Sequence, residues 1–196
     1  MHLVQRFYRG VMLPAEIDRR AVTAVVPALR TQPGFMGYTT VDFGAGLFGT
    51  FTLHADRAQS DAVSAAVPGV IRSSLADLIP HPPVQRGGEV LQHHRSGGRA
   101  TMMVVRHYES CADAAELARR VATQILPRFS ALPGLHGYTL VDEGAGRVTS
   151  LNLFGTVEDS EVANALVAPL VRLHMDGLLP LPPETRVGTV LSDIHG

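Results

Sequence analysis

The sequence repeats itself after one hundred residues, and this feature constrains the fold more than any other. PGFMGYTTVDFGAG at residues 33–46 matches PGLHGYTLVDEGAG at residues 133–146 without a gap. The same offset matches Pro80 to Pro180, and GEVL at residues 88–91 to GTVL at residues 188–191. A repeat of this length indicates two copies of one structural unit. We therefore predict two domains, residues 1–96 and 97–196, joined by a short flexible linker at residues 95–100.

Each copy has the pattern β-α-β-β-α-β. The opening strands are LVQRFYRG and TMMVVRHYE, and a Gly-Ala-Gly turn marks a hairpin in each copy. The first helix has apolar residues four apart, and Pro27 and Pro127 are expected to kink or end it. A second helix is predicted at residues 58–78 and again at 158–178, before a closing strand.

These patterns predict the α+β class, with two tandem ferredoxin-like βαββαβ units. A single unit of this kind covers one face of its sheet with helices and leaves the other face bare. Two copies in one chain can bury their bare faces against each other. We therefore expect one pseudo-dimeric α/β barrel with the helices outside, a monomer that has the option of forming a further homodimer.

Composition excludes several classes of function. The net charge of -1 gives no electrostatic footprint for nucleic acid. All 17 basic residues are arginine, so Schiff-base enzymes and lysine-bearing P-loops are excluded. The single cysteine, Cys111, permits no internal disulfide, and no spacing of histidines or carboxylates predicts a metal site. Without a signal core or a long apolar run, we expect a cytoplasmic chain with no membrane partner.

The LPG-x-x-GY-x-x-VD-x-G-x-G segment, the later LLP-x-PP and the G-x-VL strand resemble the dimeric α/β-barrel superfamily, in particular its antibiotic-biosynthesis-monooxygenase-like branch. The resemblance covers essentially the whole chain, as a fused tandem repeat. It implies a small-molecule pocket, and its members include cofactor-independent oxygenases and haem-degrading enzymes. This sequence has no tryptophan and no asparagine in either opening strand, so the catalytic set typical of those enzymes is not carried over.

The glycine-rich segment at residues 44–49 matches G-x-G-x-x-G, the dinucleotide fingerprint. It precedes a strand and not a helix, so we interpret it as a turn. Asp42 and Asp142 come just before the turn in each copy and are expected to accept hydrogen bonds from its amides. Cys111 is placed at the start of a helix, where it is interpreted as a small buried residue.

Arg6 and Tyr8 alternate along the first opening strand, as Arg106 and Tyr108 do along the second. Each pair therefore shares one face of its sheet. If that face is buried, a network with Asp or Glu is the more frequent arrangement. If it lines a pocket, the guanidinium could hold an enolate or phenolate and the phenol could donate to it.

Histidines distinguish the two copies. His107 and His174 replace Phe7 and Ser74 of the first copy. His174 falls on the apolar stripe of its helix, where a histidine is more often a core residue, the alternatives being a general base or a haem ligand.

From these observations we expect a small-molecule pocket protein in the second copy, with a degenerate first pocket. The leading hypothesis is a cofactor-independent monooxygenase acting on an aromatic or quinol-type molecule. Its expected catalytic residues are His174, His107, Arg106 and Tyr108. The alternatives are a non-catalytic ligand-binding or interaction barrel and haem binding through His174.

Overall fold

The computed structural model describes all residues from 1 to 196, which form two compact units. The first unit comprises Met1–Glu89 together with Gly188–Gly196, and the second comprises Val90–Val187. The two repeats therefore exchange their ends. Residues 188–196 of the second repeat belong to the first unit, and residues 90–96 of the first repeat belong to the second unit. The predicted domain boundary between residues 96 and 97 stays a prediction from the sequence repeat.

Strands of the first unit form one antiparallel sheet in the order β4-β1-β3-β2-β8. The strands are β1 (His2–Arg9), β2 (Phe35–Asp42), β3 (Leu47–His54) and parts of β4 (Val84–Arg95) and β8 (Glu184–His195). Strand β8 joins at the edge, where Gly37 pairs with His195 and Asp42 with Thr189. Asp18 strengthens this edge, because the Ser192 hydroxyl donates to its carboxylate at 2.9 Å and the Thr40 hydroxyl donates to it as well.

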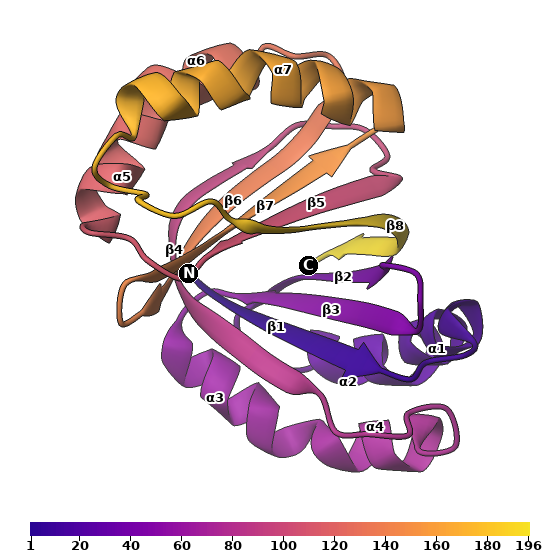
Figure 1. Cartoon of the computed structure of the whole chain (residues 1–196). Coiled ribbons are helices and arrows are strands. Elements are labelled where there is room, and N and C mark those ends of the chain that lie inside the picture. The colour runs from indigo at the N-terminus through magenta and orange to yellow at the C-terminus, as the bar shows by residue number, and fades with distance from the viewer. The chain divides into compact units, whose positions relative to one another are not determined.

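The second unit repeats this plan around β5 (Met102–Tyr108), β6 (Leu135–Gly144) and β7 (Arg147–Phe154). Strand β7 pairs with both β5 and β6. Helices cover one face of the sheet in this unit (Figure 1). The predicted α+β class and the two ferredoxin-like units are confirmed.

The first helix of each repeat contains a π-helical turn before its proline. In the first unit α1 (Pro14–Arg20) continues through η1 (Ala21–Val25) into α2 (Val26–Arg30), and in the second α5 (Ala114–Arg120) continues through η2 (Val121–Ile125) into α6 (Leu126–Phe129). Pro27 and Pro127 have no N–H to donate to the carbonyl four residues earlier, and their rings crowd it. The helix widens locally at this point and continues, in place of the predicted kink or stop.

The second helix differs between the units. Residues of the first repeat form α3 (Arg57–Ala66) and α4 (Pro68–Leu75), which are separated at Val67, whereas α7 (Val157–His174) is continuous. Pro68 has its counterpart in Ala168, whereas the proline of the second repeat, Pro169, lies inside α7 without ending the helix.

Both hairpin turns have the predicted structure. The amide of Gly44 donates to Asp42 Oδ1 at 2.8 Å, and Gly144 does the same to Asp142. Ala45 and the matching alanine, residue 145, have φ values of 48° and 52°. Because a strand follows each turn, no helix N-terminus is present there to bind a pyrophosphate.

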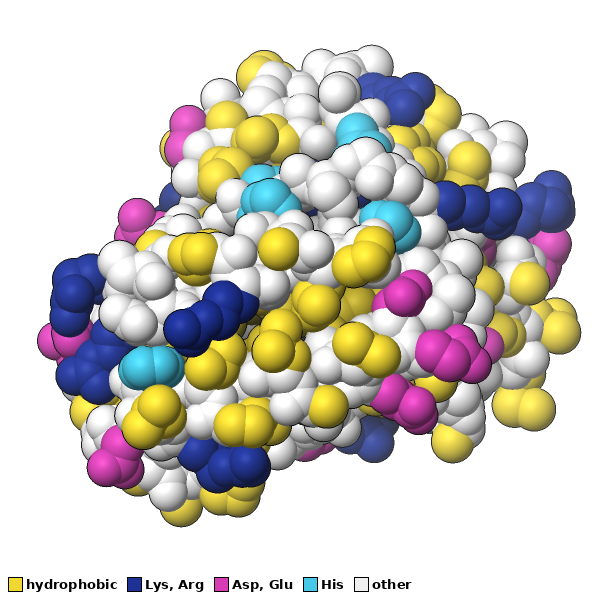
Figure 2. Space-filling model, turned by 90° about the horizontal axis from the view of Figure 1, so that it is seen from above, with side chains coloured by type: hydrophobic (Ala, Val, Ile, Leu, Met, Phe, Trp, Pro, Cys, Tyr) yellow, Lys and Arg dark blue, Asp and Glu magenta, His cyan; other side chains and the backbone are white.

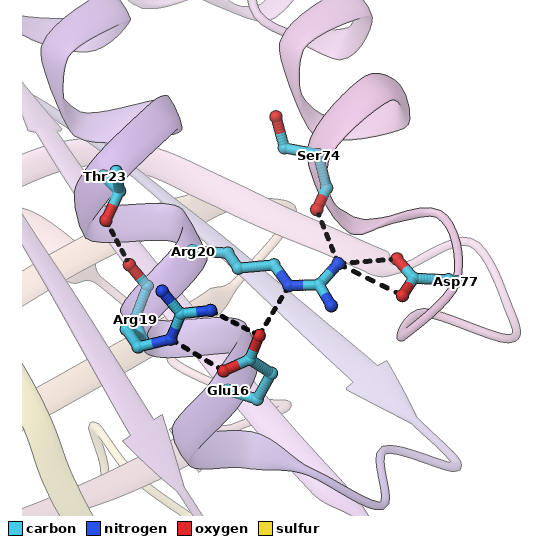
Figure 3. A network of polar contacts seen from close by, with 6 residues as sticks. All are labelled: Glu16, Arg19, Arg20, Thr23, Ser74 and Asp77. Carbon is cyan, nitrogen blue, oxygen red and sulfur yellow. Dashed lines mark hydrogen bonds and ion pairs between the residues drawn. The ribbon is translucent and has the colours of Figure 1, made fainter.

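A polar network ties the first helix of the first unit to the chain after α4. Glu16 accepts hydrogen bonds from Arg19 and Arg20, and Arg20 also reaches the Asp77 carboxylate and the Ser74 carbonyl (Figure 3). The second unit repeats the glutamate, the two arginines and the carbonyl contact, in which Arg120 Nη1 donates to the His174 carbonyl oxygen at 2.8 Å, but Gly177 takes the place of Asp77. These hydrogen bonds hold the pKa of Glu16 at about 2.

The prediction for Cys111 was wrong in its placement. Helix α5 begins at Ala114 with Asp113 as its N-cap, so Cys111 lies before the helix and donates its amide to Gly146. Burial raises the pKa of its thiol.

The outer face of α7 carries exposed apolar residues, namely Val162, Leu166 and Leu173. Seen from the side of α6 and α7, hydrophobic side chains lie among the charged ones over this face (Figure 2). None of the helices combines the length and the hydropathy that a membrane crossing requires.

Candidate functional site

The second unit contains an open cavity of about 710 Å³ between its sheet and its helices. Its walls are largely aliphatic and aromatic, with side chains from β5, β6, β7, η2, α6 and α7. The polar and charged side chains among its lining residues are few: Arg106, Tyr108, Tyr138, Ser150, Asn152, Asn164, Arg172, Asp176 and Thr185. A mainly apolar cavity with a few convergent polar groups is the usual form of a small-molecule site.

Arg106 brings a positive charge into this cavity. Its Nη2 atom donates to Asn164 Oδ1 at 3.1 Å, and this is its one hydrogen bond to the protein. Burial lowers the pKa of the guanidinium. The network with Asp or Glu that the sequence favoured is absent here, since the partner is a neutral amide. The remaining N–H groups of Arg106 therefore have no protein acceptor, which favours an anionic ligand.

Two tyrosines share the cavity with Arg106. Tyr108 follows it by two residues on β5, and Tyr138 lies on β6 with its ring packed edge-on against Phe129. Burial raises the pKa of both phenols, with Arg106 opposing the shift in each case. The phenols are therefore neutral donors at physiological pH, and neither hydroxyl has a hydrogen-bond partner in the protein.

His107 lies on the opposite face of β5 from Arg106 and Tyr108, because side chains alternate along a strand. It is 7% exposed and does not line the cavity. Its Nδ1 atom is 2.7 Å from Thr149 Oγ1, and its Nε2 atom is 2.9 Å from Glu109 Oε1. The Thr149 hydroxyl donates to Glu143 at 2.7 Å, so a polar cluster surrounds the histidine.

His174 is the last residue of α7 and is half-buried. Val171, three residues earlier, and Met175, the next residue, line the cavity, but His174 does not, and no histidine is among the lining residues. The structure thus brings Arg106 and Tyr108 together and places the two predicted histidines elsewhere. A haem held through His174 in this cavity does not fit that arrangement.

Sequence reasoning missed Tyr138, Asn164 and Asp176. Tyr138 belongs to the GYTLVD segment on β6. Because side chains alternate along a strand, the sequence could have shown that Tyr138 and Thr139 lie on opposite faces of the sheet. Asn164 follows the buried Ala163 in α7 and gave no such signal. Asp176 follows the end of α7, and the fold alone brings it to the cavity. No group of three or more His, Cys, Asp or Glu side chains is arranged to hold a metal ion.

Comparison with known proteins relates the chain to others by fold. No protein-family model and no curated protein sequence matches it. Among solved structures it is similar to a "putative monooxygenase" from Lactobacillus acidophilus, with a TM-score of 0.79, 9% identity and coverage of 99% of this chain and 95% of that one.

An anthrone oxidase-like protein matches with a TM-score of 0.64 and 11% identity, over 99% of this chain and 92% of that one. A ferredoxin-fold protein from Listeria monocytogenes, related to antibiotic biosynthesis monooxygenases, matches with a TM-score of 0.54 and 8% identity over 95% and 93% of the two chains. The fold predicted from the sequence resemblance is therefore found in proteins of the monooxygenase-like type.

Proposed function

We propose that the second unit binds an aromatic phenol, quinol or enol in its ionised form and oxygenates it without a cofactor. The observation that carries this proposal is Arg106, a half-buried cation in an apolar cavity whose one protein partner is neutral. An anionic oxygen of the substrate supplies the charge that the guanidinium lacks. Tyr108 and Tyr138, both neutral and unpartnered, donate further hydrogen bonds to the same oxygen.

Binding of this kind favours ionisation of the substrate. The guanidinium stabilises the enolate or phenolate more strongly in a cavity of low polarity than in water. Asp176 is the one carboxylate that lines the cavity, and we assign it the role of proton acceptor. The hypothesis that His107 or His174 is the base remains a prediction, although neither side chain lines the cavity.

For a CH2 group beside an ionised enol, the proposed reaction balances as follows. The substrate anion gives one electron to dioxygen, and the two radicals combine into a carbon–oxygen bond. The resulting peroxide takes up a proton. Loss of the remaining C–H proton then breaks the O–O bond and releases water, which leaves a carbonyl group. Dioxygen is the oxidant, and the product is the ketone plus one water molecule. The names of the similar monooxygenase and anthrone oxidase-like structures support this choice of reaction.

The test is dioxygen uptake with a panel of hydroquinones and anthrones. We expect Arg106→Leu to lower kcat/KM about a hundredfold, since two charge-assisted hydrogen bonds are lost. Arg128→Leu, which removes an exposed arginine of the same unit, is the matched control. Uptake that is equal in Arg106→Leu and the control would contradict the proposal. Uptake lost in a His107→Phe/His174→Ser protein that is shown to be folded, but kept in Asp176→Asn, would return the role of base to the histidines.

A further inference from the structure

The first unit has a cavity of its own, of about 530 Å³, lined entirely by residues between Arg6 and Gln85. Its apolar walls come from the matching elements of the repeat. The sequence led us to expect a degenerate copy of the second pocket. The cavity is instead open and similar in composition, and it lacks the aspartate that lines the cavity of the second unit.

Arg6 occupies the place that Arg106 has in the second unit. Its Nε atom donates to Gln85 Oε1 at 3.1 Å and its Nη2 atom donates to Ser64 Oγ at 3.2 Å. Both partners are neutral, and the Nη1 amino group has no partner in the protein. The side chain is therefore held in a fixed orientation without compensation of its charge. Burial lowers the pKa of Arg6.

The remaining ionisable side chains make this cavity more positive than the other. Arg72 and His81 line it, and both are exposed, which places them at its opening. No aspartate or glutamate is among the lining residues. Arg72 has its counterpart in Arg172, but in the second unit the positions of Ala76 and His81 are occupied by Asp176 and Leu181, which add a negative charge and remove a histidine.

We propose that the first cavity is a second ligand site, which takes a hydrophobic monocarboxylate with its carboxylate on Arg6. Apolar walls bury the hydrocarbon body, and the Nη1 amino group together with Arg72 at the opening attracts the charge. This inference stands apart from the proposed oxygenase, since it concerns other residues and requires no reaction.

Isoleucine methyl groups allow a site-resolved test. Ile17, Ile71 and Ile79 line the first cavity, Ile125 lines the second, and Ile194 lines neither. In methyl NMR spectra of the full chain, decanoate is expected to shift the signals of the first three residues saturably and to leave Ile194 unchanged. Decanol, of equal length but uncharged, is expected to bind the first cavity at least tenfold more weakly.

The matched variants are Arg6→Leu and Arg9→Leu, which remove a cavity arginine and an exposed arginine from the same strand. We expect Arg6→Leu to weaken decanoate binding at least tenfold and Arg9→Leu to leave it unchanged. Arg6→Lys, which keeps the charge, should recover part of the loss. Absence of saturable shifts at Ile17, Ile71 and Ile79, equal affinity for decanol, or full binding by a folded Arg6→Leu protein would each overturn the proposal. None of these outcomes bears on dioxygen uptake through Arg106.

Discussion

On the face of the first strand that points away from the cavity, one unit has a cluster of aromatic side chains and the other has a cluster of polar side chains. In the first unit Phe7, Phe43 and Phe51 form a cluster with ring centroids 5.8 to 6.4 Å apart. In the second unit the equivalents of Phe7 and Phe43 are His107 and Glu143, joined through Thr149. Each solution is consistent within itself, because the aromatic rings need only contact one another whereas the polar groups need partners.

Residue 49 and its counterpart show how each cluster is fitted together. A Cβ atom at Gly49 would lie 2.6 Å from the ring of Phe43, so the aromatic cluster requires glycine there. Thr149 supplies both a side chain and a hydroxyl where the second unit has a carboxylate. The comparison teaches that one backbone position can carry either an aromatic or a polar cluster, provided that the neighbouring residues change together with it.

The largest effect is expected from His107→Phe, which puts one aromatic residue into the polar cluster. Glu143, with a side chain only 3% exposed, keeps Thr149 but loses the histidine. We expect the free energy of unfolding to fall by about 3 kcal/mol, as when one partner of a buried pair is removed. Chemical denaturation measures the loss.

The triple variant His107→Phe/Glu143→Phe/Thr149→Gly tests the same cluster from the other side. It rebuilds most of the aromatic arrangement of the first unit and should recover at least half of the lost stability. If the triple variant unfolds as easily as the single one, the two clusters are not the interchangeable solutions described above.

Gly49→Thr makes the converse substitution in the first unit. The new side chain overlaps the ring of Phe43 and brings a hydroxyl without a partner into an aromatic cluster. We expect a loss of about 2 kcal/mol in chemical denaturation. Gly69→Thr, at a helical position with open space around it, should change stability by less than about 0.5 kcal/mol. A small effect at Gly49 would mean that the rings move apart at little cost.

His54 and Phe154 occupy equivalent positions in the two repeats, so the pH dependence of stability offers a further comparison of the units. Burial lowers the pKa of His54 to about 4, so the folded protein binds its proton less well than the unfolded chain, whose histidine has a pKa of 6.5. Stability from this residue is complete above pH 6.5 and is lost as the pH falls toward 4. Between pH 7 and 5 the loss is about 2 kcal/mol at most. His54→Phe, which copies the second unit, should flatten that slope in denaturation curves; an unchanged slope would assign it to other groups.

The smallest effect is expected for Asp77→Gly, which copies the second unit at the network around Glu16. The ion pair between Arg20 and Asp77 joins partly exposed groups at 2.9 Å. Its loss should lower stability by less than about 0.5 kcal/mol, and salt should reduce that difference further. A loss above about 1 kcal/mol that persists in salt would show that the carboxylate does more than pair with a screened cation.

The repeat and the alternation of side chains were sufficient to predict the elements and the shared face of Arg106 and Tyr108. Hydrophobic period and turn residues are local signals, and both copies carried them. The partners of Arg106 were not predictable in this way, because Asn164 comes from a helix 58 residues away and only packing brings the two together.

His174 illustrates a second limit. The helical period placed His174 on the apolar stripe of its helix, but the period alone does not tell which neighbour each residue of the stripe faces. Val171 and Met175 line the cavity, whereas His174, the last residue of α7, does not. Its backbone carbonyl accepts a hydrogen bond from Arg120. A difference of one residue along the helix thus separates a cavity wall from a position outside it.

The exchange of terminal segments has a consequence for how such a fused gene can change. Gly188–Gly196 completes the sheet of the first unit at β2, and Ser192 is anchored there by Asp18. A stop codon late in the second repeat would therefore leave an unpaired strand edge in the first, which is a template for aggregation. Deleting either repeat would likewise remove a segment that belongs to the compact unit of the other.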